Sequence, residues 1–128
     1  MSTFALVDFT LVKGHIRFYK LEVNGVCPLD EFWEEIESQG NLQKQLYSAI
    51  AIMERVAMNQ RLPETKYKKI SSGETVKEYE VKTKDLRIYL FRTKDGNVVV
   101  LGGKKSTQRR DINRFRNLKE EYLKTQQT

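Results

Sequence analysis

The residue types that build metal centres and disulfides are almost absent from this chain of 128 residues, which has one cysteine, Cys27, and one histidine, His15. A single cysteine cannot form an internal disulfide, and it fits a reducing compartment, so we expect a cytoplasmic protein. A zinc or non-haem iron centre needs more ligands of these types, so we expect no metal and no small-molecule cofactor. With one histidine, a cysteine–histidine or serine–histidine–aspartate catalytic group is not expected either.

Long apolar runs and phosphate-binding motifs are also absent. No run approaches the roughly 18 apolar residues that a membrane span needs, so no membrane partner is expected. The first residues, MSTFALVDFTLVKG, include an acid and lack a basic start, so they predict a strand rather than a signal peptide. The chain has neither GxxxxGK[ST] nor GxGxxG, which excludes the common nucleotide-binding folds. Its length predicts one domain, residues 1–128.

Positively charged residues outnumber negatively charged ones, and the charges are unevenly distributed along the chain. Residues 1–60 contain five Lys and Arg against eight Asp and Glu, a net charge of −3, whereas residues 61–128 contain eighteen against nine, a net charge of +9. Such asymmetry is typical of a surface that binds a polyanion. A basic surface that aids solubility, or one that meets an acidic protein, would give the same composition.

The predicted element order is ββααβββα, an α+β fold with one mostly antiparallel sheet. FALVDFTLV and HIRFYKLEV are rich in β-branched and aromatic residues, and they predict a hairpin with a short turn within residues 1–25. Residues 28–60 predict a helical hairpin on the sheet, because apolar residues recur at helical spacing and Gly40 separates two helices. Asn41 is the expected N-cap of the second helix.

The predicted segments after the helical hairpin are a polar connection, a three-stranded part of the sheet and a last helix, over residues 64–75, 76–103 and 106–124. The run DLRIYLFRT alternates, which puts Arg87 and Tyr89 on the face opposite Ile88. The run VVVL, residues 98–101, is apolar at every position, as in a central strand covered on both faces.

The stretch LGGKKSTQRRDINRF, residues 101–115, joins this strand to the last helix and carries the cations Lys104, Lys105, Arg109 and Arg110. Its two glycines end the strand and allow close approach of the backbone. Helix N-termini attract anions, whereas the two arginines oppose the helix dipole, and a bound anion would remove that penalty. The stretch is therefore a candidate anion site. The alternative is a solvated helix start, where each arginine costs about a few tenths of a kcal/mol.

Further cations lie on and before the predicted strands. Lys82 and Arg87 are on neighbouring strands joined by a short turn, so their side chains share a face if the register allows. Another cluster comprises Lys66, Lys68 and Lys69. Aromatic residues among these cations would stack with the bases of single-stranded RNA, or they belong to the core if their face is buried. They are Tyr67, Tyr79, Tyr89 and Phe91.

The segments EYEVK, LRIYLF and VVVLGGKKSTQRRDINRFRNL together resemble the RelE/ParE superfamily of type II toxin–antitoxin toxins, in particular its addiction-module killer and HigB-like branch. Members of that branch commonly read roughly YELR, then YRVYF, then a strand ending in GGxKSTQxxDIxRA. The similarity covers about residues 76–120 and is strongest over GGKKSTQRRDI. The resemblance implies a RelE/ParE-like toxin whose sheet carries a concave basic face.

The resemblance also implies an activity. Relatives of the RelE type cut mRNA in the ribosomal A site without a metal, and the RNA 2′-hydroxyl attacks the adjacent phosphate to leave a 2′,3′-cyclic phosphate. By position in the motifs, Arg87 would brace the scissile phosphate, Lys82 would assist the 2′-hydroxyl or the transition state, and Lys104 and Lys105 would hold flanking phosphate. RNA or ribosomal RNA would be bound more diffusely by Lys66, Lys68, Lys69, Arg109 and Arg110.

The chain departs from the family pattern in several places. Lys82 replaces the arginine of YELR, which keeps the charge but loses the bidentate fork. The tract from Lys82 to Arg87 is short, and Phe115 replaces the alanine after DIxR. Tyr122 has an inward spacing, which favours core packing over the role of a terminal-helix tyrosine found in some relatives.

Alternative functions stay open at this point: a ParE-like inhibitor of DNA gyrase, or a non-toxic nucleic-acid- or protein-binding module of the same fold. For a toxin, the expected partners are mRNA on the ribosome and a cognate antitoxin with acidic residues against the basic face.

Overall fold

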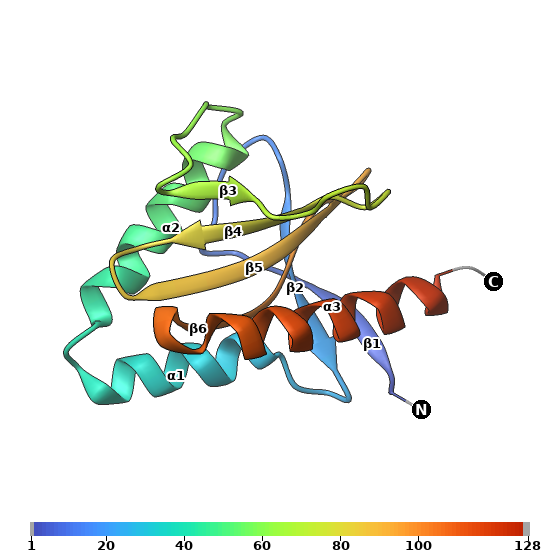
Figure 1. Ribbon diagram of the computed structural model, residues 1–128, viewed down its shortest axis with the longest axis horizontal. Coiled ribbons are helices and arrows are strands. Elements are labelled where there is room, and N and C mark those ends of the chain that lie inside the picture. Colours follow the sequence, from blue (N-terminus) through green and yellow to red (C-terminus); the bar gives the residue numbers. More distant parts are fainter. Residues whose placement is uncertain (1, 127–128) are drawn as a thin grey trace.

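The strands come in two groups along the chain, separated by two helices, and they join into one mixed sheet (Figure 1). The structure, a computed structural model, describes residues 2–126. Its elements are β1 (Phe4–Asp8), β2 (Phe18–Val23), α1 (Pro28–Gln39), α2 (Gln43–Ala57), β3 (Tyr67–Lys69), β4 (Glu78–Lys82), β5 (Leu86–Thr93), β6 (Gly96–Lys104), the 3-10 turn η1 (Lys105–Thr107) and α3 (Gln108–Thr125). This is an α+β fold, as the sequence predicts.

The six strands are ordered β1-β2-β6-β5-β4-β3. β2 and β6 run parallel, and the other neighbouring pairs of the described sheet are antiparallel, which confirms the mostly antiparallel sheet. A parallel pair needs a long crossover, and α1 and α2 lie in the connection that leads from β2 to the rest of the sheet. β5 and β6 are central. The VVVL segment of β6 is 0–1% exposed, so it is covered on both faces as its composition predicts.

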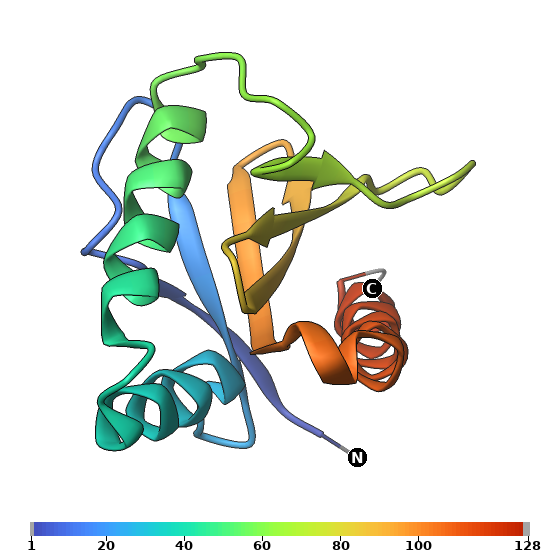
Figure 2. The ribbon, with the colours of Figure 1, turned by 60° about the vertical axis from the view of Figure 1, so that its left-hand side comes forward.

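Helices cover both faces of the sheet (Figure 2). On one face α1 and α2 pack around Ile36, Met53 and Ile88, and on the other face α3 packs around Tyr89 and Phe115. We name these the α1–α2 face and the α3 face. β5 supplies both cores because its side chains alternate between the faces.

The N-terminal hairpin is confirmed, but a loop of residues 9–17 joins β1 to β2 in place of a short turn. Phe9 and Val12 of this loop are buried in the core of the α1–α2 face. The N–H of His15 donates to Ala57 O at 2.9 Å, which holds the loop against the end of α2. The extra residues therefore complete the core beside the sheet.

Two predictions about the middle of the chain are wrong. The polar stretch 64–75 contains the edge strand β3, so the strand and helix order is ββααββββα rather than ββααβββα. β3 has only three residues, too few for alternation to indicate a strand, and it forms by pairing with β4. α2 has Leu42 at its N-cap without a side-chain cap hydrogen bond, so Asn41 does not cap it.

A third prediction is wrong because β6 does not end at Gly102 and Gly103 but continues to Lys104. A Cβ on Gly102 would lie 2.5 Å from the Phe32 ring of α1, and a Cβ on Gly103 would overlap the Asp111 carboxylate of α3. The glycines therefore let two helices approach opposite faces of one strand. The close approach predicted at this pair is made by the chain's own side chains.

Candidate nucleic-acid interface

Two cations lie side by side on the α3 face, at the end of the sheet where β4 turns into β5, and a third adjoins them through its backbone. Lys82 is the direct cross-strand partner of Arg87. The N–H of Lys82 donates to Lys66 O, just before β3, at 2.8 Å. Direct partners of an antiparallel pair share a face, so the prediction that Lys82 and Arg87 lie on one face is confirmed. We name Lys66, Lys82 and Arg87 the basic row.

The turn at the end of the basic row is held by Gln45 of α2. Gln45 Oε1 accepts from the N–H of Asp85 at 2.8 Å, and Gln45 Nε2 donates to Asp85 Oδ2 at 2.7 Å. The N–H of Lys105 donates to Asp85 O at 2.8 Å, which ties the start of η1 to the same turn. Lys84 and Lys105 are exposed, so they add two cations to this end of the sheet.

The structure separates two predicted site residues from the basic row. Lys68 pairs with Glu80 of β4 and lies on the α3 face. Lys69 pairs with Tyr79 and faces the other side of the sheet. Lys104 pairs with Leu86, a residue of the α1–α2 core, so it also leaves the α3 face. Lys69 and Lys104 therefore cannot bind the same phosphate as the basic row.

Arg109 and Arg110 are exposed in the first turn of α3, as predicted. Gln108, one residue earlier, donates from Nε2 to Glu80 Oε2 at 2.7 Å, so the start of α3 lies over β4. Arg110 instead has its Nε 3.7 Å from Asp111 Oδ1. Asp111 is an acid in the first turn, and it offsets part of the penalty that two cations incur at a helix N-terminus.

Arg87 is only 7% exposed, which the sequence did not indicate. Its Nη1 donates to Thr83 O at 2.7 Å and to Leu86 O at 2.9 Å. Its Nε is buried without a hydrogen-bond partner. The guanidinium therefore holds the carbonyl groups of the β4–β5 turn in place. Its Nη2 also forms no hydrogen bond within residues 2–126 but is not fully buried, so Nη2 is the donor that a ligand could reach.

Polar and charged groups lie close together beneath the start of α3. Glu80 and Tyr89 are cross-strand partners, 2% and 0% exposed, and the Tyr89 hydroxyl is buried without a partner. Burial raises the pKa of Tyr89 above its ordinary value, the charges of Glu80 and Asp111 raise it further, and Arg87 opposes them. Tyr89 therefore stays protonated at neutral pH and can only donate or accept a hydrogen bond.

The aromatic residues among the cations do not present open faces for base stacking. Tyr89 and Phe91 are fully buried against α3, which confirms the core alternative for these two. The Tyr67 and Tyr79 rings stack on each other with centroids 5.0 Å apart, and the Arg92 guanidinium lies over Tyr79. RNA contacts at this surface would therefore depend on cations rather than on rings.

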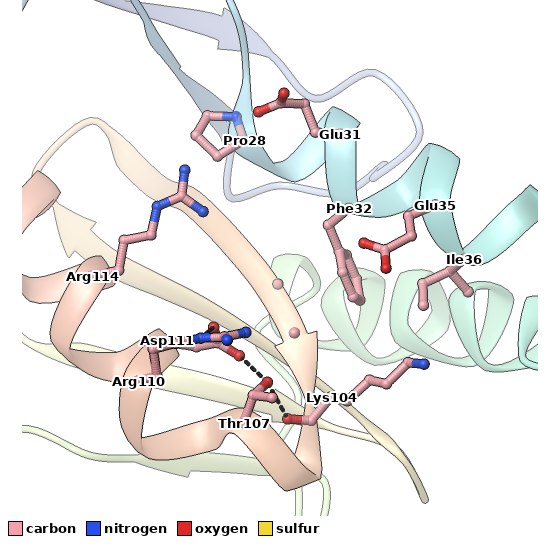
Figure 3. A pocket seen from close by; sticks show the side chains of 12 residues that line it. Pro28, Glu31, Phe32, Glu35, Ile36, Lys104, Thr107, Arg110, Asp111 and Arg114 are labelled. Atoms are coloured by element: carbon pink, nitrogen blue, oxygen red, sulfur yellow. Dashed lines mark hydrogen bonds and ion pairs between the residues drawn. The ribbon is translucent and has the colours of Figure 1, made fainter.

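A cavity of about 380 Å³ opens between α1 and α3 over the end of β6 (Figure 3). Glu31 and Glu35 lie on its α1 side, Arg110 and Arg114 lie on its α3 side, and Lys104 lies at one end. In the described part of the chain no ion pair joins the two sides. The acids on one wall would repel a polyanion, so the basic row is the better nucleic-acid site.

The basic row can bind phosphate groups and stabilise negative charge on them. It lacks a histidine for proton transfer, because His15 lies in the β1–β2 loop. Within residues 2–126, no three His, Cys, Asp or Glu residues are grouped so that they could hold a metal ion. No helix over those residues has the length and apolar character that crossing a membrane requires.

Buried charges elsewhere on the α3 face were not predicted. Lys119 Nζ donates to Glu78 Oε2 at 2.8 Å, and Arg116 Nε donates to Glu78 Oε1 at 2.9 Å, which fastens α3 to β4. Asp111 is also buried, and its Oδ2 accepts from the Thr107 hydroxyl at 2.6 Å. Asp111 and Lys119 lie four residues before and after the core position 115, and this helical spacing is the signal that could have identified them.

Comparisons of the chain with protein-family models, with curated proteins and with solved structures give no match. The observations that bear on function are therefore the geometry of the basic row and the sequence motifs.

Proposed function

We propose that the chain is the toxin of a type II toxin–antitoxin system, of the RelE/ParE superfamily and its HigB-like branch, and that it cuts mRNA on the ribosome. The observation that carries the proposal is the cross-strand row of Lys66, Lys82 and Arg87. It lies on the α3 face, beside exposed Lys68 and Lys105. Neither Lys66, Lys68 nor Lys82 forms an ion pair within residues 2–126, so their charges are free for phosphate.

The proposed reaction needs charge stabilisation more than a strong base. The RNA 2′-hydroxyl gives its proton to water and its oxygen attacks the adjacent phosphorus. The bond to the 5′-oxygen breaks, and that oxygen takes a proton from water as it leaves. The products carry a 2′,3′-cyclic phosphate and a 5′-hydroxyl. Lys82, half-buried beside Arg87, is placed to stabilise the charge that grows on the phosphate, and exposed Lys66 would hold the flanking backbone.

The role of Arg87 changes from the one that the motif implies. Because Nη1 bonds Thr83 O and Leu86 O, Arg87 is first a positioning residue that fixes the turn beside Lys82. Its Nη2, which forms no hydrogen bond within residues 2–126 and is not fully buried, remains for a phosphate oxygen. Lys104 and Lys69 are removed from the catalytic surface in this proposal, because they face the other side of the sheet.

Induced expression in a bacterial host, with primer extension across abundant translated mRNAs, tests the proposal. We expect growth arrest and cuts inside reading frames that vanish when translation is blocked. Lys82→Ala should remove the cuts, whereas Lys69→Ala should keep them. Lys69 is a matched control because it is an exposed lysine of the neighbouring strand on the opposite face. Equal cutting by both variants would place the chemistry elsewhere.

A second candidate function is a ParE-like inhibitor of DNA gyrase that acts by binding alone. The burial of Arg87 favours it, because binding needs only the exposed cations and no guanidinium at the reacting phosphate. Growth arrest with DNA-damage signalling and uncut mRNA would support this candidate. Expression without growth arrest would leave a non-toxic binding module of the same fold. For either toxin, we propose a cognate antitoxin that covers the basic row with acidic residues.

A further inference from the structure

The two edges of the sheet differ in a way that the proposed function does not use. The β3 edge carries exposed Lys68 and Lys69, and lysines at an edge discourage pairing with another strand. The β1 edge has the sequence FALVD, with no cation, and Leu6 is 36% exposed there. In the described chain β1 pairs with β2 alone, and no helix covers its outer side. An exposed apolar edge of this kind is a template for a further strand.

Hydrogen bonds at the two ends of β1 identify which backbone groups face outward. The N–H of Asn24 donates to Thr3 O at 2.8 Å, and the N–H of Phe9 donates to Phe18 O at 2.9 Å. Bonded and non-bonded pairs alternate along an antiparallel ladder. The odd-numbered residues of β1 therefore bond to β2, and the even-numbered residues direct their N–H and C=O groups away from the sheet.

We propose that two copies of the chain pair antiparallel through β1, with the two-fold axis at Leu6. The outward groups belong to Phe4, Leu6 and Asp8, and this register joins all of them. Phe4 lies opposite Asp8 of the partner subunit, and Leu6 lies opposite its own copy, which gives about six backbone hydrogen bonds. The exposed Leu6 side chains then meet on the α3 face, and the two sheets become one.

The charge distribution permits a second copy at this edge. The excess of cations is in residues 61–128, whereas residues 1–60 have a net charge of −3. β1 and the basic row lie at opposite ends of the strand order. Pairing through β1 therefore keeps the two basic rows far apart, and no like charges face each other in the proposed register. Each basic row also stays open to its own ligand.

Sedimentation velocity over a range of protein concentrations tests the proposal. We expect a monomer–dimer equilibrium for the full chain. Leu6→Lys should weaken the dimer at least tenfold, because two ammonium groups would face each other at the axis. Tyr47→Lys is the control, because Tyr47 is 64% exposed on α2 and should leave the equilibrium unchanged. Circular dichroism checks that both variants fold.

The register is tested by disulfide cross-linking in a Cys27→Ser background. Leu6→Cys should oxidise to a covalent dimer, because Cα atoms of a bonded antiparallel pair lie about 5.5 Å apart, within the range of a disulfide. Ala5→Cys should not, because Ala5 lies opposite Val7 of the partner subunit. A chain that stays monomeric at every concentration would overturn the proposal. It would do so even if the β1 edge then pairs with a strand of another protein. A dimer that Leu6→Lys leaves intact would also overturn it.

Discussion

At the scale of single residues, Gly103 shows how tightly the α3 face is packed. A methyl group at this position would occupy the space of the Asp111 carboxylate, which accepts the Thr107 hydroxyl. We expect Gly103→Ala to lower the free energy of unfolding by about 1–3 kcal/mol, a typical cost of overpacking. Urea denaturation measures it. When Asp111→Ala is added to Gly103→Ala, the double variant should lose less stability than the sum of the two single variants. Fully additive losses would contradict this explanation.

The hydroxyl of Tyr89 predicts a gain in stability when it is removed. It is buried without a partner, and such a group costs about 1–3 kcal/mol, so Tyr89→Phe should raise the free energy of unfolding by about 1 kcal/mol at neutral pH. Tyr47→Phe, at an exposed position, should change little. Thermal or urea denaturation of both variants gives the comparison, and a marked loss of stability in Tyr89→Phe would show that the hydroxyl has a bonding partner.

Tyr89 also predicts a pH dependence at alkaline pH. Its pKa is raised above the ordinary value of 10.0, first by burial. Below pH 10 the hydroxyl is protonated in both the folded and the unfolded chain. Above pH 10 the unfolded chain ionises first, so stability falls as pH rises. In Tyr89→Phe the free energy of unfolding should fall less steeply between pH 10 and 11. An unchanged slope would mean that other groups cause the loss of stability.

At the scale of elements, the contact between α3 and β4 depends on a buried ion pair. Glu78 is 1% exposed and Lys119 is 6% exposed, and they are bonded at 2.8 Å. Removing one partner of a buried pair costs about 3–5 kcal/mol when the other charge is left unpaired, but Arg116 still bonds Glu78, so Lys119→Met should destabilise the chain by less than that. Adding Glu78→Gln should restore much of the loss. Lys124→Met, at an exposed position of the same helix, is the control in urea denaturation.

The elements that the sequence predicts well are those whose pattern is local. The alternation of residues 86–91 and the apolar run 98–101 predict the faces of β5 and the burial of β6, and both are confirmed. β3 was missed because its three residues become a strand only through β4. The proximity of Lys82 and Arg87 follows from a short turn, whereas the burial of Arg87 depends on where the turn carbonyls and α3 lie. Such long-range placement leaves no periodic signal in the chain.

At the scale of the whole molecule, the separation of cations between two faces predicts how RNA binding responds to salt. For single-stranded RNA, each phosphate contact contributes about 0.7 to the slope of log K against log salt. Lys82→Ala should reduce the slope for a short RNA by about that amount, and Lys69→Ala should reduce it much less. Fluorescence anisotropy at several KCl concentrations measures the slopes. Equal reductions would mean that RNA does not distinguish the two faces.

The parallel pairing of β2 with β6 has a consequence for how the chain reaches its native state. This pairing joins Tyr19 to Val98, about 80 residues apart in the chain. The centre of the sheet therefore has high contact order, and its formation waits until nearly all of the chain has been synthesised. Until β6 arrives, the hairpin of β1 and β2 has two unpaired edges. Folding of this protein should accordingly be slow and late, and a nascent chain that stops before β6 should lack the basic row's rigid support.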